Sequence, residues 1–316
     1  MDKNTKIYIA GNTGMVGSAI QHNLELKGYT EFVFTPYPEY DLTNQKTVQD
    51  FFEKERPEYV IDAAAKVGGI LANNTLRAQF IYENLMIQNN LIHNAHISGV
   101  KKLLFLGSSC IYPRDCSQPI REEYLLTNEL EQTNEPYAIA KIAGIKMCEN
   151  YYRQYGSNFI SVMPTNLYGP RDNFNLKTSH VIPALIRKFH EAKVNHYPEV
   201  IVWGTGHIKR EFLYVDDLAD ACVYLLQRLE ATELYTSGVT HINIGCGYDQ
   251  SIQELAMMIG ETVGFIGKIN FDDSMLEGTP QKLLDISYLK ELGWEAKISL
   301  EEGLRLSYDW YLENYV

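Results

Sequence analysis

The chain has 316 residues, of which 45% are hydrophobic and 22% are charged, and its formal net charge is −12. No apolar run approaches the roughly 20 residues that span a bilayer, and the acidic charge argues against a surface for nucleic acid or an anionic membrane. The cysteines are odd in number, scattered and without metal-binding spacing: Cys110, Cys116, Cys148, Cys222 and Cys246. We therefore expect reduced thiols, no metal site, no membrane or nucleic-acid partner, and a cytoplasmic protein.

A short buried strand is predicted at Lys6–Ala10, and it runs directly into a glycine-rich turn and an amphipathic helix. In that turn Gly11 suits a tight bend, Gly14 a close approach to phosphate, and Gly17 close packing of helix on strand. Backbone N–H groups and the helix dipole would then meet a pyrophosphate. The pattern favours dinucleotide binding over a turn with a merely structural role.

Further apolar runs alternate with helical patterns, which is typical of a doubly wound parallel sheet in an α/β protein. The runs are Glu31–Thr35, Tyr59–Ala63, Lys102–Gly107 and Phe159–Met163. Two later runs, at Val200–Trp203 and His241–Gly245, lie in more irregular sequence.

A segment rich in Pro, Gly and Asn follows Asn166, and we interpret it as a boundary between two lobes. We predict a dinucleotide-binding Rossmann domain at 1–170. The remainder, 171–316, would be mainly a smaller α/β lobe for substrate, with some chain crossing back to the Rossmann sheet.

Tyr137 and Lys141 lie four residues apart in the stretch NEPYAIAK, so on a helix they share one face. An ammonium beside a phenol favours the phenolate and lowers the phenol pKa, which would make the pair an acid/base unit. Ser108 follows a predicted strand, where it could hydrogen-bond a substrate carbonyl beside Tyr137. The alternatives are an ordinary surface pair and a serine tied to the backbone.

These features together resemble the extended short-chain dehydrogenases/reductases that act on nucleotide sugars. More narrowly, nearly the whole chain resembles the GDP-L-fucose synthase family. The resemblance rests on the glycine turn and on AAAKVGGI (Ala63–Ile70), FLGSSCIYP (Phe105–Pro113), NEPYAIAKIAGIKMCE (Asn134–Glu149), VMPTNLYGPRDNF (Val162–Phe174), SHVIPALI (Ser179–Ile186) and the block from Trp203 to Asp217.

This resemblance implies a homodimeric, bifunctional enzyme. It would epimerise C3 and C5 of GDP-4-keto-6-deoxy-D-mannose and reduce C4 with NADPH to give GDP-L-fucose. The resemblance assigns the epimerisations to Cys110 and His180. The alternatives are that Cys110 is an inert buried cysteine and that His180 caps a helix. Cys110 would project to the same side as Ser108 if extended geometry persists. His180 precedes a predicted helix whose dipole would keep its ring neutral. In the reduction Tyr137 would give its proton to the sugar oxygen, while Lys141 holds the nicotinamide ribose.

The resemblance also implies two sets of binding residues. The cofactor set is Gly11, Asn12, Thr13, Gly14, Met15, Val16, Gly17, Asp41, Leu42, Ala64, Leu106, Gly107, Lys141, Pro164, Thr165, Asn166, Leu167 and His180. The substrate set is Lys188, Trp203, Arg210 and Glu277. Lys282 is a further candidate, although an exposed, salt-bridged loop would explain it equally.

One departure concerns the cofactor, because the 2′-phosphate of NADP needs cations near the first glycine turn and after the second strand. The turn carries Asn12 and Thr13, and Thr35–Glu39 follows the strand, with neither Arg nor Lys at either place. An acidic residue ending the second strand, which favours NAD, is also missing. We retain NADPH as the expected cofactor and do not exclude NAD.

Four other functions share parts of this pattern. A redox-neutral nucleotide-sugar 4-epimerase has the Ser/Tyr/Lys set but no use for Cys110 and His180. A 4,6-dehydratase would need a carboxylate as the acid/base group after the fourth strand, where this chain has Ser108-Ser109-Cys110. A GDP-L-colitose synthase, acting on the 3-deoxy analogue, is not excluded. A regulatory protein that binds the cofactor without catalysis would not need Cys110 or His180.

Overall fold

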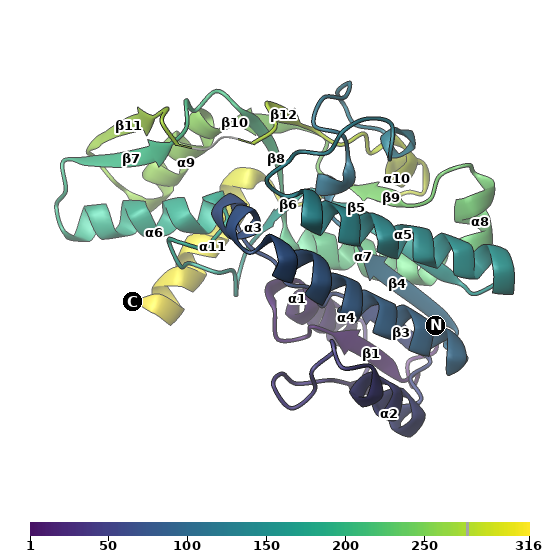
Figure 1. Ribbon diagram of the computed structural model, residues 1–316. Coiled ribbons are helices and arrows are strands. Elements are labelled where there is room, and N and C mark those ends of the chain that lie inside the picture. Colours follow the sequence, from purple (N-terminus) through teal and green to yellow (C-terminus); the bar gives the residue numbers. More distant parts are fainter. Residues whose placement is uncertain (276–277) are drawn as a thin grey trace.

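The computed structural model describes residues 1–275 and 278–316. Its largest sheet has parallel strands in the order β2-β1-β3-β4-β5-β9, of which Figure 1 labels all but β2. The chain places β2 on one side of β1 and β3 on the other, so the topological switch point lies beside β1. The strands are β1 (Ile7–Ala10), β2 (Phe32–Val33), β3 (Tyr59–Asp62), β4 (Lys102–Leu106), β5 (Phe159–Pro164) and β9 (Ile242–Ile244).

Helices cover both faces of this sheet, which confirms the predicted doubly wound arrangement. One face carries α1 (Met15–Leu26) and α7 (Val215–Arg228), and the other carries α2 (Gln45–Glu55), α4 (Arg77–Ile97) and α5 (Glu135–Tyr155). Figure 1 shows α4 and α5 running side by side. The short elements are α3 (Ile70–Thr75), α8 (Ala231–Thr236), α10 (Ser287–Glu291) and the 3-10 turns η1 (Ser109–Ile111) and η2 (Glu122–Tyr124).

The strands are apolar throughout because both faces are covered. In β1, Ile7 and Ile9 pack under α1 and α7, whereas Tyr8 and Ala10 pack under α2 and α4. All four side chains are fully buried. The continuous apolar run that predicted this strand therefore reflects burial on two sides.

A smaller lobe is formed by later parts of the chain. Its strands are β6 (Asn166–Tyr168), β8 (Lys209–Tyr214), β10 (Asp249–Ser251) and β12 (Gln281–Lys282), which pair around β8, together with the pair β7 (Glu199–Trp203) and β11 (Lys268–Asp272). Its helices are α6 (Val181–Val194), α9 (Ile252–Val263) and α11 (Leu300–Tyr315), and they enclose a separate apolar core.

Part of the chain after residue 171 returns to the large sheet. Strand β9 is one of its strands, and helix α7 packs on one of its faces. Glu211 of β8, whose side chain is buried, accepts hydrogen bonds from the backbone N–H of Gly247 at 2.7 Å and of Leu284 at 2.9 Å. The division into 1–170 and 171–316 stays a prediction.

Close packing of α5 on β4 sets the position of the predicted acid/base pair. Pro136 lies in the first turn of α5, and Gly156 ends the helix with φ of 71°. Between them Gly144 faces Phe105 of β4, and a Cβ at Gly144 would lie 2.3 Å from Cζ of that buried ring. Only a residue without a side chain allows this approach.

Gly144→Ala should therefore lower the free energy of unfolding by about 1–3 kcal/mol, since the methyl group overpacks the contact between helix and sheet. Gly260→Ala is the matched control, because its Cβ would meet Phe189 at an ordinary 3.4 Å and alanine favours the helix α9. Urea unfolding of both variants measures the difference. Equal stability of the two variants would contradict this packing.

Candidate active site

A cleft of about 1010 Å³ lies at the carboxyl ends of the parallel strands, between the large sheet and the smaller lobe. Residues that follow β1 and β3, together with the last residues of β4 and β5, line one side of it, and residues from α6, β7 and β8 line the other. A volume of this size suits a dinucleotide together with a nucleotide sugar. The cleft is where ligands bind in open parallel sheets.

The glycine turn forms one end of the cleft and leaves no room for side chains. Gly11 has φ of +78°, and a Cβ there would lie 2.9 Å from the carbonyl oxygen of Ala63. A Cβ on Gly17 would lie 2.2 Å from the carbonyl oxygen of Gly11. Gly14 begins α1 without a side-chain cap, so the first N–H groups of the helix are not satisfied by a capping side chain. This cradle fits a pyrophosphate.

The structure brings every predicted cofactor residue to this cleft. Beyond the glycines and Lys141, the lining includes Asn12, Thr13, Met15, Val16, Asp41, Leu42, Ala64, Leu106, Gly107, Pro164, Thr165, Asn166, Leu167 and His180. Their individual roles stay predictions.

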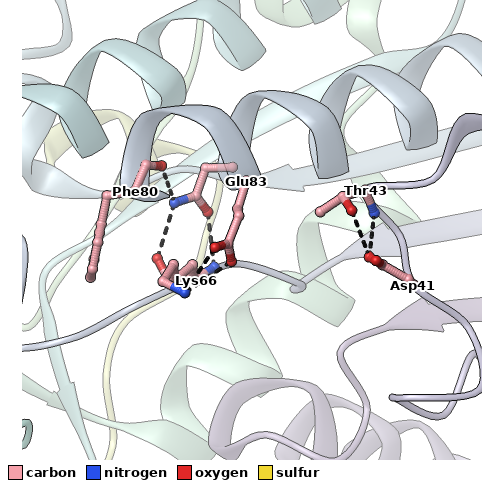
Figure 2. A network of polar contacts seen from close by, with 6 residues as sticks. Asp41, Thr43, Lys66, Phe80 and Glu83 are labelled. Carbon is pink, nitrogen blue, oxygen red and sulfur yellow. Dashed lines mark hydrogen bonds and ion pairs between the residues drawn. The ribbon is translucent and has the colours of Figure 1, made fainter. Parts of the chain in front are cut away.

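Two polar contacts shape the wall near β2 and β3 (Figure 2). Asp41 accepts hydrogen bonds from the backbone N–H of Thr43 at 2.9 Å and from its hydroxyl at 2.7 Å. The Lys66 ammonium lies 2.9 Å from a carboxylate oxygen of Glu83. The Glu83 carboxylate therefore neutralises the positive charge of Lys66 on this wall of the cleft.

Tyr137 and Lys141 of α5 lie beside Ser108, at the end of β4. Lys141 donates a hydrogen bond to the carbonyl oxygen of Leu106 at 2.7 Å, and its Nζ is 5.9 Å from the centre of the Tyr137 ring. The Phe80 ring packs edge-on against Tyr137, with ring centres 6.2 Å apart. These contacts hold the phenol in the cleft at a defined place.

The prediction that Lys141 lowers the pKa of Tyr137 is wrong. Burial raises the pKa of Tyr137 and outweighs the opposing hydrogen bond with Ser108. Burial also lowers the pKa of Lys141, against the attraction of Asp62. The phenol is therefore protonated at neutral pH and available as a proton donor.

Cys110 reaches the cleft by a different geometry from the one predicted. The strand does not stay extended, because residues Ser109–Ile111 form the turn η1. Ser108 itself is extended, and its hydroxyl accepts a hydrogen bond from the Cys110 N–H at 3.4 Å, which favours the turn. The Cys110 side chain is buried at the cleft wall, and burial raises the pKa of its thiol.

His180 stands at the N-terminal boundary of α6, as predicted, and lines the cleft. Its side chain makes no capping hydrogen bond, so the helix-capping alternative does not describe it. The His180 side chain is exposed to solvent inside the cleft, but the protein atoms around it disfavour the charged form of the ring and lower the pKa of His180. A neutral imidazole can accept a proton at neutral pH.

Three of the predicted substrate residues lie together at the far side of the cleft. Lys188 lies over the Trp203 ring, 5.2 Å from its centre, and donates to the carbonyl oxygen of Ile201 at 3.1 Å. Trp203 is 41% exposed, so it is a surface of the cleft rather than core. Arg210 also lines the cleft. Glu277 lies outside the described residues.

The cleft contains further polar groups that the sequence reasoning did not assign. Asp172 is buried, and burial raises its pKa to about 7, while one of its carboxylate oxygens has no hydrogen-bond partner among the described residues. Asn134 has a similar unpaired oxygen. Both residues lie in sequence motifs that resemble the GDP-L-fucose synthase family, Asn134 in Asn134–Glu149 and Asp172 in Val162–Phe174. Their place in these motifs could have identified them as candidates. Across the described ranges, no cluster of His, Cys, Asp or Glu is arranged to hold a metal ion.

The comparisons with known proteins agree with this arrangement. Residues 7–245 match the NAD dependent epimerase/dehydratase family. GDP-L-fucose synthase 1 of Arabidopsis thaliana is 58% identical over 99% of this chain and 95% of its own length. GDP-L-fucose synthase of Escherichia coli K12 is 54% identical over 98% and 97%.

More distant relatives extend the comparison. GDP-L-colitose synthase of Yersinia pseudotuberculosis is 38% identical over 97% of this chain and 98% of its own length. The crystal structure of a GDP-L-fucose synthetase from Naegleria fowleri bound to NADP superimposes with a TM-score of 0.88 at 29% identity, covering 100% of this chain and 96% of that one. The chain belongs to the NAD dependent epimerase/dehydratase family and, within it, to the GDP-L-fucose synthases.

Proposed function

We propose that this protein converts GDP-4-keto-6-deoxy-D-mannose to GDP-L-fucose by epimerising C3 and C5 and reducing C4 with NADPH. The observation that carries this proposal is the composition of one cleft. It joins the Ser108, Tyr137 and Lys141 set to two further proton-transfer groups, Cys110 and His180. A simple reductase or a redox-neutral 4-epimerase has no use for the last two.

The epimerisations follow from the acidity that the C4 ketone gives to the protons at C3 and C5. Each inversion needs one group that removes a proton and another that returns it from the opposite face. Cys110 and the neutral imidazole of His180 supply these groups. Ser108 and the protonated Tyr137 donate hydrogen bonds to the oxygen on which negative charge develops.

The reduction uses Tyr137 as the acid. Its raised pKa keeps the proton on the phenol until the C4 oxygen becomes basic. NADPH, when bound, supplies the hydride to C4. The glycine cradle would hold its pyrophosphate, and Lys141 its nicotinamide ribose, beside Tyr137.

NADPH is supported by the NADP that the Naegleria fowleri relative binds. In this chain Asn12, Thr13 and Thr35 line the adenosine end of the cleft, at the positions where arginines are expected to bind the 2′-phosphate of NADP. Their side chains and nearby backbone N–H groups would therefore have to hold the 2′-phosphate. The expected preference for NADPH over NADH is accordingly modest.

The opposite end would bind the GDP part of the substrate. Lys188 and Arg210 supply positive charge for the diphosphate, and Trp203 presents a flat apolar face to the nucleotide or sugar. These assignments complete the predicted substrate set, apart from Glu277.

We further propose a cytoplasmic homodimer that associates through the outer faces of α4 and α5. Both helices expose large apolar side chains, including Tyr82, Ile97, Ile139 and Tyr155. None of the helices in 1–275 or 278–316 is long and apolar enough to cross a membrane.

Mixing the protein with GDP-4-keto-6-deoxy-D-mannose and NADPH should oxidise one NADPH per sugar and yield GDP-L-fucose. The decrease in nicotinamide absorbance and identification of the sugar measure this. Repeating the assay with NADH gives the ratio of kcat/KM for the two cofactors. No oxidation with this substrate, but oxidation with the 3-deoxy analogue, would replace the proposal with colitose synthesis. No oxidation with either substrate would exclude both syntheses.

Tyr137→Phe should slow reduction by about 10²–10⁴-fold, because the C4 oxygen loses its proton donor. Proton exchange at C3 and C5, followed by mass spectrometry in deuterated water, should partly survive. Tyr152→Phe is the control, since Tyr152 is on the same helix and its ring stacks on Tyr235 instead of lining the cleft. Parallel loss of exchange and reduction in Tyr137→Phe would show that the two roles are not divided in this way.

A further inference from the structure

Lys282 is a charged side chain in the wall of the cleft that the proposed mechanism does not use. It is half-buried and lines the cleft, and its side chain has neither a hydrogen bond nor an ion pair within the described part of the chain. The alternative of an exposed, salt-bridged loop is therefore wrong for this lysine. Burying an ammonium costs free energy unless a carboxylate forms an ion pair with it. A half-buried lysine in a cleft without such an ion pair is therefore a candidate for a functional role.

The backbone around Lys282 is fixed from both sides. On one side β12 pairs in parallel with β8, which places Lys282 opposite Arg210. On the other side the Gln118 side chain accepts from the Leu283 N–H at 2.9 Å and donates to the Gln281 carbonyl oxygen at 3.3 Å. The direction in which the Lys282 side chain leaves the strand is therefore determined by the fold.

Lys282 and Cys110 line the same cleft, and the strand that carries Lys282 packs beside the segment that follows Cys110. Along an extended chain alternate side chains share a face, so Lys282 lies on the same face as Leu284. Leu284 is buried in one apolar cluster with Ile111 and Tyr112, the two residues that follow Cys110. The Gln281 side chain leaves the other face and donates to Asp249 at 2.6 Å.

The two groups also influence each other electrostatically. Burial raises the pKa of the Cys110 thiol, and the positive charge of Lys282 is the first of the influences that oppose this rise. Reciprocally, burial lowers the pKa of Lys282, and Cys110 opposes that change. The other titratable groups that act on Cys110 or Lys282, or on which Cys110 acts, are Lys141, Tyr137, Arg210, Glu131 and Cys116.

We propose that Lys282 is a positioning residue that acts through Cys110, its ammonium stabilising the thiolate that accepts a proton during epimerisation. This inference rests on the proposed function. In the step concerned, a C–H bond next to the ketone breaks as an S–H bond forms on Cys110, and the electron pair moves to the ketone oxygen. His180, after taking a proton from water, gives it to the opposite face of the carbon, and the S–H proton passes to water, which restores the thiolate. Lys141 is less suited to this task, because its ammonium donates to the Leu106 carbonyl.

The first test needs no substrate, so it can be read even if the proposed function fails. The rate of Cys110 alkylation by iodoacetamide is measured against pH in the full-length protein, with peptide mass spectrometry to follow that cysteine. Lys282→Met should move the midpoint of the profile up by about one pH unit, since an opposite charge is lost. Lys282→Arg should keep most of the wild-type midpoint, and it covers the case in which the methionine variant does not fold.

Lys209→Met is the matched control, because it removes the same charge from the adjacent strand at an exposed position outside the cleft lining. Its alkylation midpoint should equal that of the wild type. An unchanged midpoint in Lys282→Met would overturn the proposal.

A second readout separates this role from binding of the diphosphate. In Lys282→Met the rate of proton exchange on the bound sugar should fall at neutral pH and partly recover as the pH rises. A higher KM for the GDP-sugar, with exchange at saturation and the thiol midpoint unchanged, would assign Lys282 to the diphosphate and contradict the inference.

Discussion

The hydrogen bond from Lys141 to the carbonyl oxygen of Leu106, at 2.7 Å, joins α5 to the end of β4. One turn further along α5, Gly144 allows the helix to lie directly against Phe105. Together these contacts place Tyr137 beside Ser108, and Ser108 in turn precedes the turn that carries Cys110. The reacting groups are thus fixed by packing between regular elements, and the geometry of the site depends on how closely one helix approaches one strand.

Burial then decides which groups hold protons. The cleft raises the pKa of Tyr137 and lowers that of His180, so a protonated acid and a neutral base face the same volume at neutral pH. The same burial would leave Cys110 protonated, which opposes its use as a base. A cation would stabilise the Cys110 thiolate, and in our proposal Lys282 of the smaller lobe supplies that positive charge. The cleft therefore uses both lobes to adjust proton affinities, with the large sheet supplying the acid and the smaller lobe the compensating charge.

The sequence predicted the parts of this structure that depend on local patterns. Buried strands read as continuous apolar runs because helices cover both faces, and Gly11 and Gly17 of the first turn stand where side chains would collide. Three features depended on tertiary structure instead. The path at Cys110 follows the hydrogen bond that the Ser108 hydroxyl accepts from the Cys110 N–H, and the pKa of Tyr137 follows its desolvation in the cleft. Lys282 reaches the cleft because β12 pairs with β8 and because Gln118, which is distant in sequence, holds the backbone on either side of Lys282. Neither spacing nor propensity contains that information.

In the mechanism proposed for this cleft, protons exchange at two sugar carbons and hydride is added at a third. Turnover of GDP-4-keto-6-deoxy-D-mannose in deuterated water with unlabelled NADPH, with the label located by NMR of the product, distinguishes these events. We expect deuterium at C3 and C5 and protium at C4. Deuterium at only one of the two carbons, or at neither, would contradict the assignment of two epimerisations to this site.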